Sequence, residues 1–150
     1  MRGPAGRRVR ALNVLSRLRE EEVNRVTGEL RRLQGQIAEL AAERGRLEAG
    51  LAENAHVDTL EGSFFLARYA RDVRSRLLGL DRRVAEITPL CTALEERIRD
   101  LYVEAKTYDS LEVRIRAAAV RDRARREAEA LEEAHLIRMT ARALRGASRS

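Results

Sequence analysis

The sequence predicts an all-α protein in which two long helices form an antiparallel coiled-coil hairpin, the second helix longer than the first. Charged residues make up 36% of the chain and aromatic residues 3%, and Ala, Leu, Glu and Arg recur at helical spacing. This composition is typical of long helices that share a narrow apolar seam. Two heptad frames run through the chain, and the segment between them has no regular period. These observations predict one domain over residues 1–150.

The first helix is expected over about residues 7–53. Its central part carries apolar residues at heptad positions a and d, which face the partner helix in a coiled coil. Arg44 is the one charged residue among these positions. The frame comprises Val23, Val26, Leu30, Leu33, Ile37, Leu40, Arg44, Leu47 and Leu51.

The turn is expected over about residues 54–62. The segment "AENAHVDTLEGS" is rich in residues that favour turns and shows no clean period. Ser63 is predicted to cap the second helix, since a serine side chain can accept a hydrogen bond from a free backbone N–H at a helix start.

The second helix is expected over about residues 63–143, with frayed termini. Its heptad frame passes through Pro89 without a change of phase, and Pro89 falls at an outer position. The pattern therefore favours one continuous helix with a kink at this proline. The alternative is a real break, with Thr88 as N-cap and Pro89 at the first helical position. The frame comprises Leu66, Ala70, Val73, Leu77, Leu80, Val84, Ile87, Cys91, Leu94, Ile98, Leu101, Ala105 and Tyr108.

The two frames predict a register for the hairpin, because a positions of one helix layer with d positions of an antiparallel partner. Folding about the turn sets Leu33 beside Val84 and Val26 beside Cys91. In this register Arg7 is level with Ser110, and the rest of the second helix is left without a partner. The predicted seam includes Val26, Leu33, Leu40, Leu77, Val84 and Cys91.

The sequence contains none of the common catalytic, nucleotide-binding or metal-binding motifs. It contains no glycine-rich phosphate loop, no HExxH and no CxxC. The single cysteine, Cys91, falls in the seam, where a packing thiol is favoured over a nucleophile. The apolar runs are too short for a membrane span, and no apolar segment follows the basic start as in a secretory signal. We expect no enzymatic activity, no cofactor, no metal and no small-molecule substrate.

The basic residues are almost all arginines and give a net charge of +6. Because acidic residues are interspersed with them, most are predicted to form solvated helix faces. Nucleic-acid binding is the alternative, since the stretch up to Arg19 contains arginines and no acid. A phosphate-binding protein should carry a continuous basic stripe, whereas "RDRARREAEALEEAH" alternates in sign and lacks stacking aromatics. No specific nucleic-acid partner is expected.

The aromatic residues cluster just after the turn. Phe64 and Phe65 are the only phenylalanines, and Tyr69 and Val73 follow them at helical spacing. The seam between two helices needs only the a and d positions, so these aromatic residues widen the apolar face of the second helix beyond what the pair requires. The cluster either covers the turn or forms an exposed docking patch for another protein.

The segment "EAKTYDSLEVR" carries a resemblance to a known family, the flagellar export protein FliJ and its injectisome counterparts. Its residues are similar to the family's E-x-K-T-x-E-x-L-x-x-R run, and "FFLARYARDVRSRLL" resembles the aromatic-bearing start of the family's second helix. The resemblance covers about residues 11–142. The matching residues of the run are Glu104, Lys106, Thr107, Asp109, Leu111 and Arg114.

The resemblance implies a coiled-coil stalk of a type III export apparatus in the cytoplasm, peripheral to the inner face of the membrane. It implies binding to the hexameric export ATPase, to the membrane export gate and to export chaperones. Phe64, Phe65, Tyr69 and Val73 would then face the gate. The end that carries both termini would enter the ATPase ring, with Arg7, Arg8, Arg10, Arg114, Arg121 and Arg125 as candidate contacts. A generic coiled-coil scaffold or dimeriser is the alternative.

Overall fold

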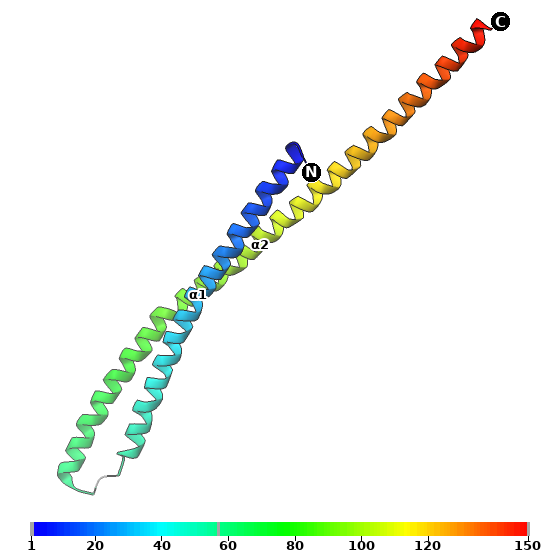
Figure 1. Cartoon of the computed structure of the whole chain (residues 1–150). Helices are drawn as coiled ribbons and strands as arrows, with labels where there is room; N and C mark the ends of the chain where they lie inside the picture. The colour runs from blue at the N-terminus through cyan, green and yellow to red at the C-terminus, as the bar shows by residue number, and fades with distance from the viewer. Residues whose placement is uncertain (1, 57, 150) are drawn as a thin grey trace. The chain divides into compact units, whose positions relative to one another are not determined.

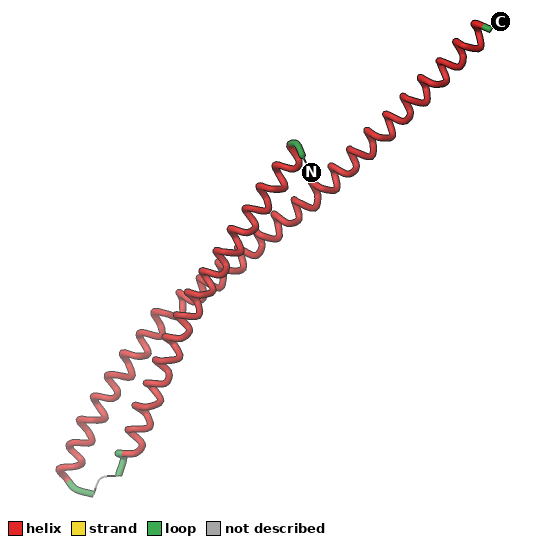
Figure 2. The backbone as a smooth tube through the Cα atoms, viewed as in Figure 1, coloured by secondary structure: helices red, strands yellow, loops and turns green. Residues whose placement is uncertain are grey.

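The computed structural model describes residues 2–56 and 58–149, and Val57 of the predicted turn lies outside these ranges. The chain folds into two long helices, α1 (Pro4–Glu53) and α2 (Leu60–Ser148), joined by a short connection (Figures 1 and 2). The described residues contain no strand. The predicted all-α fold of two paired helices, the second longer, is therefore confirmed. Both helices begin before the predicted residue, and α2 also ends later than predicted.

The start of α1 follows from the residues Gly3 and Pro4. Gly3 has a φ of 98°, a left-handed conformation that glycine adopts without steric cost. Pro4 occupies the first helical position, where its missing N–H is not needed. The backbone N–H of Arg7 donates to the Gly3 carbonyl at 3.1 Å, which closes the first turn. The helix thus begins three residues earlier than Arg7, where the sequence pattern put it.

The N-cap of α2 is Thr59 and not Ser63, so this prediction from the sequence is wrong. The backbone N–H of Gly62 donates to the Thr59 hydroxyl at 3.1 Å, and the N–H of Ser63 donates to the Thr59 carbonyl at 2.9 Å. Thr and Ser cap helices by the same hydrogen bond, so the two candidates differ only in where the apolar pattern is taken to begin.

Pro89 lies inside α2, which continues without interruption on both sides of it. The alternative of a break at Thr88 is therefore wrong. The Thr88 hydroxyl donates to the Val84 carbonyl at 2.8 Å, and the Thr92 hydroxyl donates to the Thr88 carbonyl at 3.3 Å. These bonds add a second donor to the carbonyls of Val84 and Thr88; the carbonyl that loses its helix donor to the proline is that of Ala85.

Contacts divide the chain into two units. We call residues 19–103 the turn unit, because they include the connection between the helices. We call residues 1–18 together with 104–150 the terminal unit. Each unit contains a segment of α1 and a segment of α2.

The turn unit is held together by two apolar clusters. In the first, Leu30 and Leu33 of α1 pack with Ile87 and Cys91 of α2. In the second, Val23 and Val26 pack with Leu101, which is completely buried. Both clusters extend to the half-buried Leu94 and Ile98 of α2. Closely packed interlocking side chains of this kind are the basis of coiled-coil stability.

The register of these clusters corrects the predicted one. The sequence frames set Cys91 beside Val26, but Cys91 packs with Leu30 and Leu33, and Val26 packs with Leu101. The two helices are therefore displaced by about one heptad from the predicted alignment. A displacement of one heptad keeps every a position opposite a d position, so the apolar pattern alone cannot distinguish the two registers.

The heptad frames themselves are confirmed by burial. All the predicted a and d residues of both helices are buried or half-buried, including the charged Arg44. The predicted seam residues Val26, Leu33 and Cys91 are buried, and Leu40, Leu77 and Val84 are half-buried.

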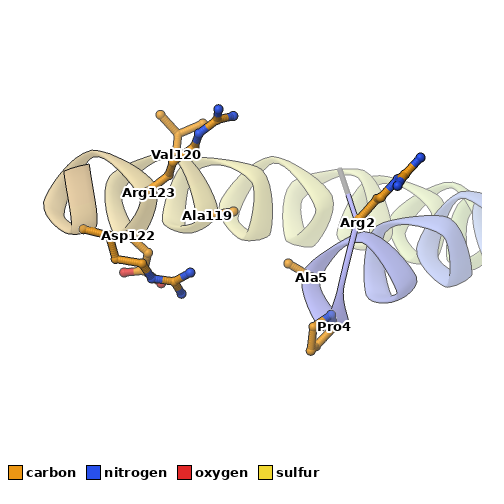
Figure 3. Close-up of a pocket in the computed structure, with 8 residues that line it drawn as sticks. Arg2, Pro4, Ala5, Ala119, Val120, Asp122 and Arg123 are labelled. Carbon is orange, nitrogen blue, oxygen red and sulfur yellow. The ribbon is translucent and has the colours of Figure 1, made fainter. Parts of the chain in front are cut away.

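In the terminal unit the seam continues farther than the sequence predicted. On α1 it includes Val9, which is 4% exposed, and Ser16, which is 7% exposed. On α2 it runs through Ala105 and Ile115 to Ala119. Ala119 and Val120 line a groove with Pro4 and Ala5 (Figure 3), so α2 is partnered well beyond Ser110. Residues 121–133 are all exposed.

Candidate interaction surfaces

Among residues 2–56 and 58–149, no group of three or more His, Cys, Asp or Glu side chains is placed to hold a metal ion. Cys91 is 7% exposed and packs among apolar side chains. Its surroundings are those of a packing thiol, because a reactive cysteine needs access to solvent and an electropositive setting.

An exposed apolar surface lies at the start of α2. Leu60, Phe64 and Phe65 are 77%, 71% and 75% exposed, and we call these three residues the turn patch. The sequence did not single out Leu60, because the second helix was expected to begin after it. Large apolar side chains that gather in the open are typical of protein-binding sites.

The other two residues of the predicted aromatic stripe belong to the hairpin itself. Val73 is only 2% exposed, so it is a seam residue and is not available for docking. Tyr69 is half-buried, and a Cβ atom added at Gly50 would lie 2.8 Å from the Tyr69 hydroxyl oxygen. Gly50 therefore leaves room for this ring against α1. Of the predicted cluster, Phe64 and Phe65 are therefore exposed, whereas Tyr69 and Val73 pack between the two helices.

Charged side chains join the two helices of the turn unit. The Glu22 carboxylate accepts a hydrogen bond from Arg97 of α2 at 2.9 Å and one from Arg19 at 3.0 Å. The hydrogen bond from Arg97, more than the neighbouring Arg19, lowers the pKa of Glu22 against the opposing effect of desolvation. Closer to the turn, Arg44 binds both Asp81 and Glu48, and the hydrogen bond to Asp81 raises the pKa of its guanidinium.

A partly buried polar contact marks the seam of the terminal unit. The Ser16 hydroxyl donates a hydrogen bond to the Asp109 carboxylate at 3.1 Å. Asp109 belongs to the "EAKTYDSLEVR" run, which the sequence analysis singled out by resemblance. Its structural role here is to accept a hydrogen bond across the helix pair.

The arginines named as candidate contacts all lie in the terminal unit, and all are exposed: Arg7, Arg8, Arg10, Arg114, Arg121 and Arg125. Arg125 forms an ion pair with Asp122 at 3.6 Å. Arg2 and Arg123 line the groove at the start of α1 together with Asp122 (Figure 3). Arg126 lines it as well, and none of these three arginines was among the candidate contacts. The arrangement is basic and open to solvent.

The last part of α2 exposes apolar side chains. Leu131, Ile137 and Leu144 are 72%, 62% and 68% exposed. Leu136, Ile137, Ala141 and Leu144 line a shallow apolar groove along one side of the helix. Such a helix is marginal in water unless another surface covers it.

Comparison with family models, with curated proteins and with solved structures finds no match. Within the described residues, neither helix has a stretch apolar enough to cross a bilayer. The fold and its surfaces define a class, a coiled-coil hairpin that exposes an apolar patch beside the turn and arginines and apolar side chains in the terminal unit.

Proposed function

We propose that this chain is a non-enzymatic stalk or coupling component of a type III protein export apparatus, of the flagellar or the injectisome kind. It binds the hexameric export ATPase through the terminal unit and the membrane export gate through the turn patch. Under this proposal it works in the cytoplasm at the inner face of the membrane, with export chaperones as further partners. The resemblance of residues 104–114 to the FliJ family suggests these partners.

The observation that carries the proposal is that the chain exposes two neighbouring aromatic rings beside the turn and, in the terminal unit, the arginines that the resemblance assigns to the ATPase. The rings are Phe64 and Phe65, and the arginines include Arg7 and Arg114. Exposed aromatic residues are frequent hot spots for binding proteins, and arginines bind carboxylates in a bidentate manner. Two such surfaces on one chain suit a protein that couples two different partners.

The ATPase arm of the proposal is tested by adding the purified chain to the cognate ATPase. We expect oligomerisation and ATP hydrolysis to rise. Deletion of residues 127–150 should weaken this effect while the hairpin stays helical, because the C-terminal segment is removed but the seam, which ends near Ala119, and the candidate arginines up to Arg125 remain. A deletion after Ser110, the boundary suggested by the sequence register, would also remove Ile115 and Ala119 from the seam. Unchanged stimulation by the shorter chain would remove the C-terminal segment from the mechanism.

The gate arm is tested with the double variant Phe64→Ala and Phe65→Ala. Both rings are exposed, so helicity and the melting temperature should hardly change, whereas a buried phenylalanine would cost about 3–5 kcal/mol. Binding to the gate protein should weaken and ATPase stimulation should persist. Leu78→Ala is the matched control, since Leu78 is 59% exposed in the same unit. A large fall in melting temperature would show that the rings cover the turn instead.

A generic scaffold or dimeriser is the second candidate, and the exposed apolar residues Leu131, Ile137 and Leu144 favour it. Sedimentation of the chain alone separates the two functions. Self-association that disappears on Ile137→Asp, together with no effect on the ATPase, would favour the dimeriser. A monomer that stimulates the ATPase would favour the stalk.

A further inference from the structure

The first part of α1 carries apolar side chains on two opposite faces. Val9 and Ser16 are buried in the seam, which fixes the inner face. Val14, Leu15 and Leu18 are 56%, 37% and 51% exposed and therefore lie outside the seam. With Ala11 they follow the spacing i, i+3, i+4, i+7, so they form one stripe along the outside of the helix. The hairpin does not need this stripe for its own packing.

Arginines border the stripe. Arg10 and Arg17 are two helical turns apart and lie along one edge of the stripe. Arg8 lies along the other edge, two turns before Leu15. Arg7 precedes Ala11 by one turn. All four arginines are exposed, and no ion pair to any of them is present in the described part of the chain. The first acidic residue of the sequence is Glu20, so no carboxylate within residues 1–19 offsets this charge.

An apolar stripe bordered by cations is the pattern of a helix that lies in the surface of an anionic bilayer. Arginine head groups reach the lipid phosphates, and the apolar side chains enter the boundary between head groups and acyl chains. A nucleic acid would use the same arginines but would gain nothing from Val14 and Leu18. An acidic protein surface would favour ion pairs, with the apolar stripe left in water. The combination therefore matches an anionic lipid surface best.

We propose that the outer face of α1, made by Ala11, Val14, Leu15 and Leu18 with Arg7, Arg8, Arg10 and Arg17, docks directly on an anionic lipid bilayer. This interaction goes beyond the proposed export function, in which partners hold the chain at the membrane. Arg7, Arg8 and Arg10 are also candidate contacts of the ATPase, so the ring and the bilayer exclude one another. The test uses the chain alone, so its failure leaves the ATPase proposal untouched.

The experiment measures co-sedimentation of the full chain with vesicles. Wild type should bind vesicles of phosphatidylcholine and phosphatidylglycerol in equal parts, and should not bind phosphatidylcholine alone. The double variant Arg10→Gln and Arg17→Gln should bind about thirtyfold more weakly, at roughly fivefold for each basic residue. The double variant Val14→Gln and Leu18→Gln should bind about tenfold more weakly or worse, because it loses the apolar contact.

Matched controls come from exposed residues of the turn unit. Arg76→Gln with Arg82→Gln removes the same charge, and Leu78→Gln with Leu90→Gln removes comparable apolar surface. Both control variants should bind vesicles like wild type. Loss of binding in these controls would show that general charge or apolar content decides binding, and would overturn the assignment to α1. Absence of wild-type binding to the anionic vesicles would overturn it as well.

A duplex DNA arm separates the lipid surface from other polyanions. The variant Val14→Gln and Leu18→Gln should lose vesicle binding and keep whatever weak, salt-sensitive DNA binding the wild type has. If this variant binds vesicles as tightly as wild type, the contact is purely electrostatic and the proposal fails.

A dye attached through Leu15→Cys gives a readout that does not depend on these variants folding. Cys91 is buried, so the added cysteine takes the label. Its emission should shift to the blue on anionic vesicles, and a dye at Leu78→Cys should not shift. Equal behaviour of the two dyes would also contradict the proposal.

Discussion

The Ser16 hydroxyl and the Asp109 carboxylate face each other across the helix pair of the terminal unit, 3.1 Å apart. Ser16 is 7% exposed and occupies a seam position where an apolar residue would be expected. A buried polar group is costly when its partner is missing, so the buried Ser16 hydroxyl favours a register that sets it level with the exposed Asp109. The predicted register, in contrast, sets Ser16 level with Leu101.

We therefore predict energetic coupling between Ser16 and Asp109. In a double-mutant cycle of Ser16→Ala and Asp109→Ala, the coupling free energy should be about 1 kcal/mol, because Asp109→Ala leaves the buried Ser16 hydroxyl without its partner. Urea unfolding of the four proteins measures it. A cycle of Ser16→Ala with Leu101→Ala serves as the control and should be additive. Coupling in the control but not in the first cycle would favour the register predicted from the sequence.

Glu22 makes the stability of the hairpin depend on pH. Hydrogen bonding to Arg97 lowers the pKa of Glu22 in the folded chain below its value in the unfolded chain. The unfolded state then binds the proton more readily, so the stability from this contact is present above the ordinary glutamate pKa and is lost as the pH falls through the lowered value.

Glu22→Gln should accordingly lower stability at neutral pH and make the loss of stability on acidification shallower. Urea unfolding over the range from pH 6 to pH 3 checks both effects. Glu96→Gln is the control, because Glu96 is exposed and no ion pair of the described residues includes it. Parallel acid profiles for wild type and Glu22→Gln would contradict the role of the Arg97 contact.

At the scale of the helix, Pro89 is a local weakness that α2 tolerates. Its side chain is exposed and lies on the outer side of the helix. A proline in a helix interior removes one hydrogen bond and clashes with the preceding turn. The seam residues on either side, Ile87 and Cys91, are both buried and supply the packing that keeps the helix continuous.

Pro89→Ala should stabilise the chain, by up to about 3 kcal/mol if the surrounding helix can relax fully. Thermal and urea unfolding measure the gain. Pro4→Ala is the matched control and should change little, because proline suits the first position of a helix. No gain at position 89 would mean that the helix does not bear the usual cost of this proline.

The sequence predicted the two helices, their seam residues and the continuity of α2 at Pro89, because all of these follow from a local period. It could not predict the register, since the frames fit equally well after a shift of one heptad. The information that distinguishes the registers lies in polar contacts such as Ser16 with Asp109 and Arg44 with Asp81. The early part of the seam was missed for a different reason, since the buried Ser16 interrupts the apolar pattern.

The candidate surfaces were predicted only in part. Phe64 and Phe65 are exposed as a docking patch requires, whereas Val73 is buried and Tyr69 packs against α1. Helical spacing puts Phe65, Tyr69 and Val73 near one side of α2, but the position of the partner helix decides which of them are covered. The outer stripe of α1 could have been found from the spacing of Val14 and Leu18 once the inner face was known.

At the scale of the whole molecule, the contacts of the turn unit predict that one chain supplies both helices of the pair. Glu39 and Arg83 are exposed and line one groove with Leu40 and Ile87. Spin labels at positions 39 and 83 of one chain should give a short distance that does not change on dilution with unlabelled protein. A short distance that disappears on dilution would show a coiled coil between two chains.

The equivalence of registers one heptad apart has a mechanical consequence. Sliding one helix along the other by seven residues moves it by about 10 Å and restores every apolar layer. At intermediate positions the seam side chains of one helix would collide with those of the other. The helix pair therefore resists small sliding movements and has preferred registers one heptad apart. Within the turn unit, the contact of Asp81 with Arg44 joins the two helices and holds one of these positions. Axial force on either helix of this unit would therefore be resisted until this contact breaks, and the helix would then move by one whole heptad.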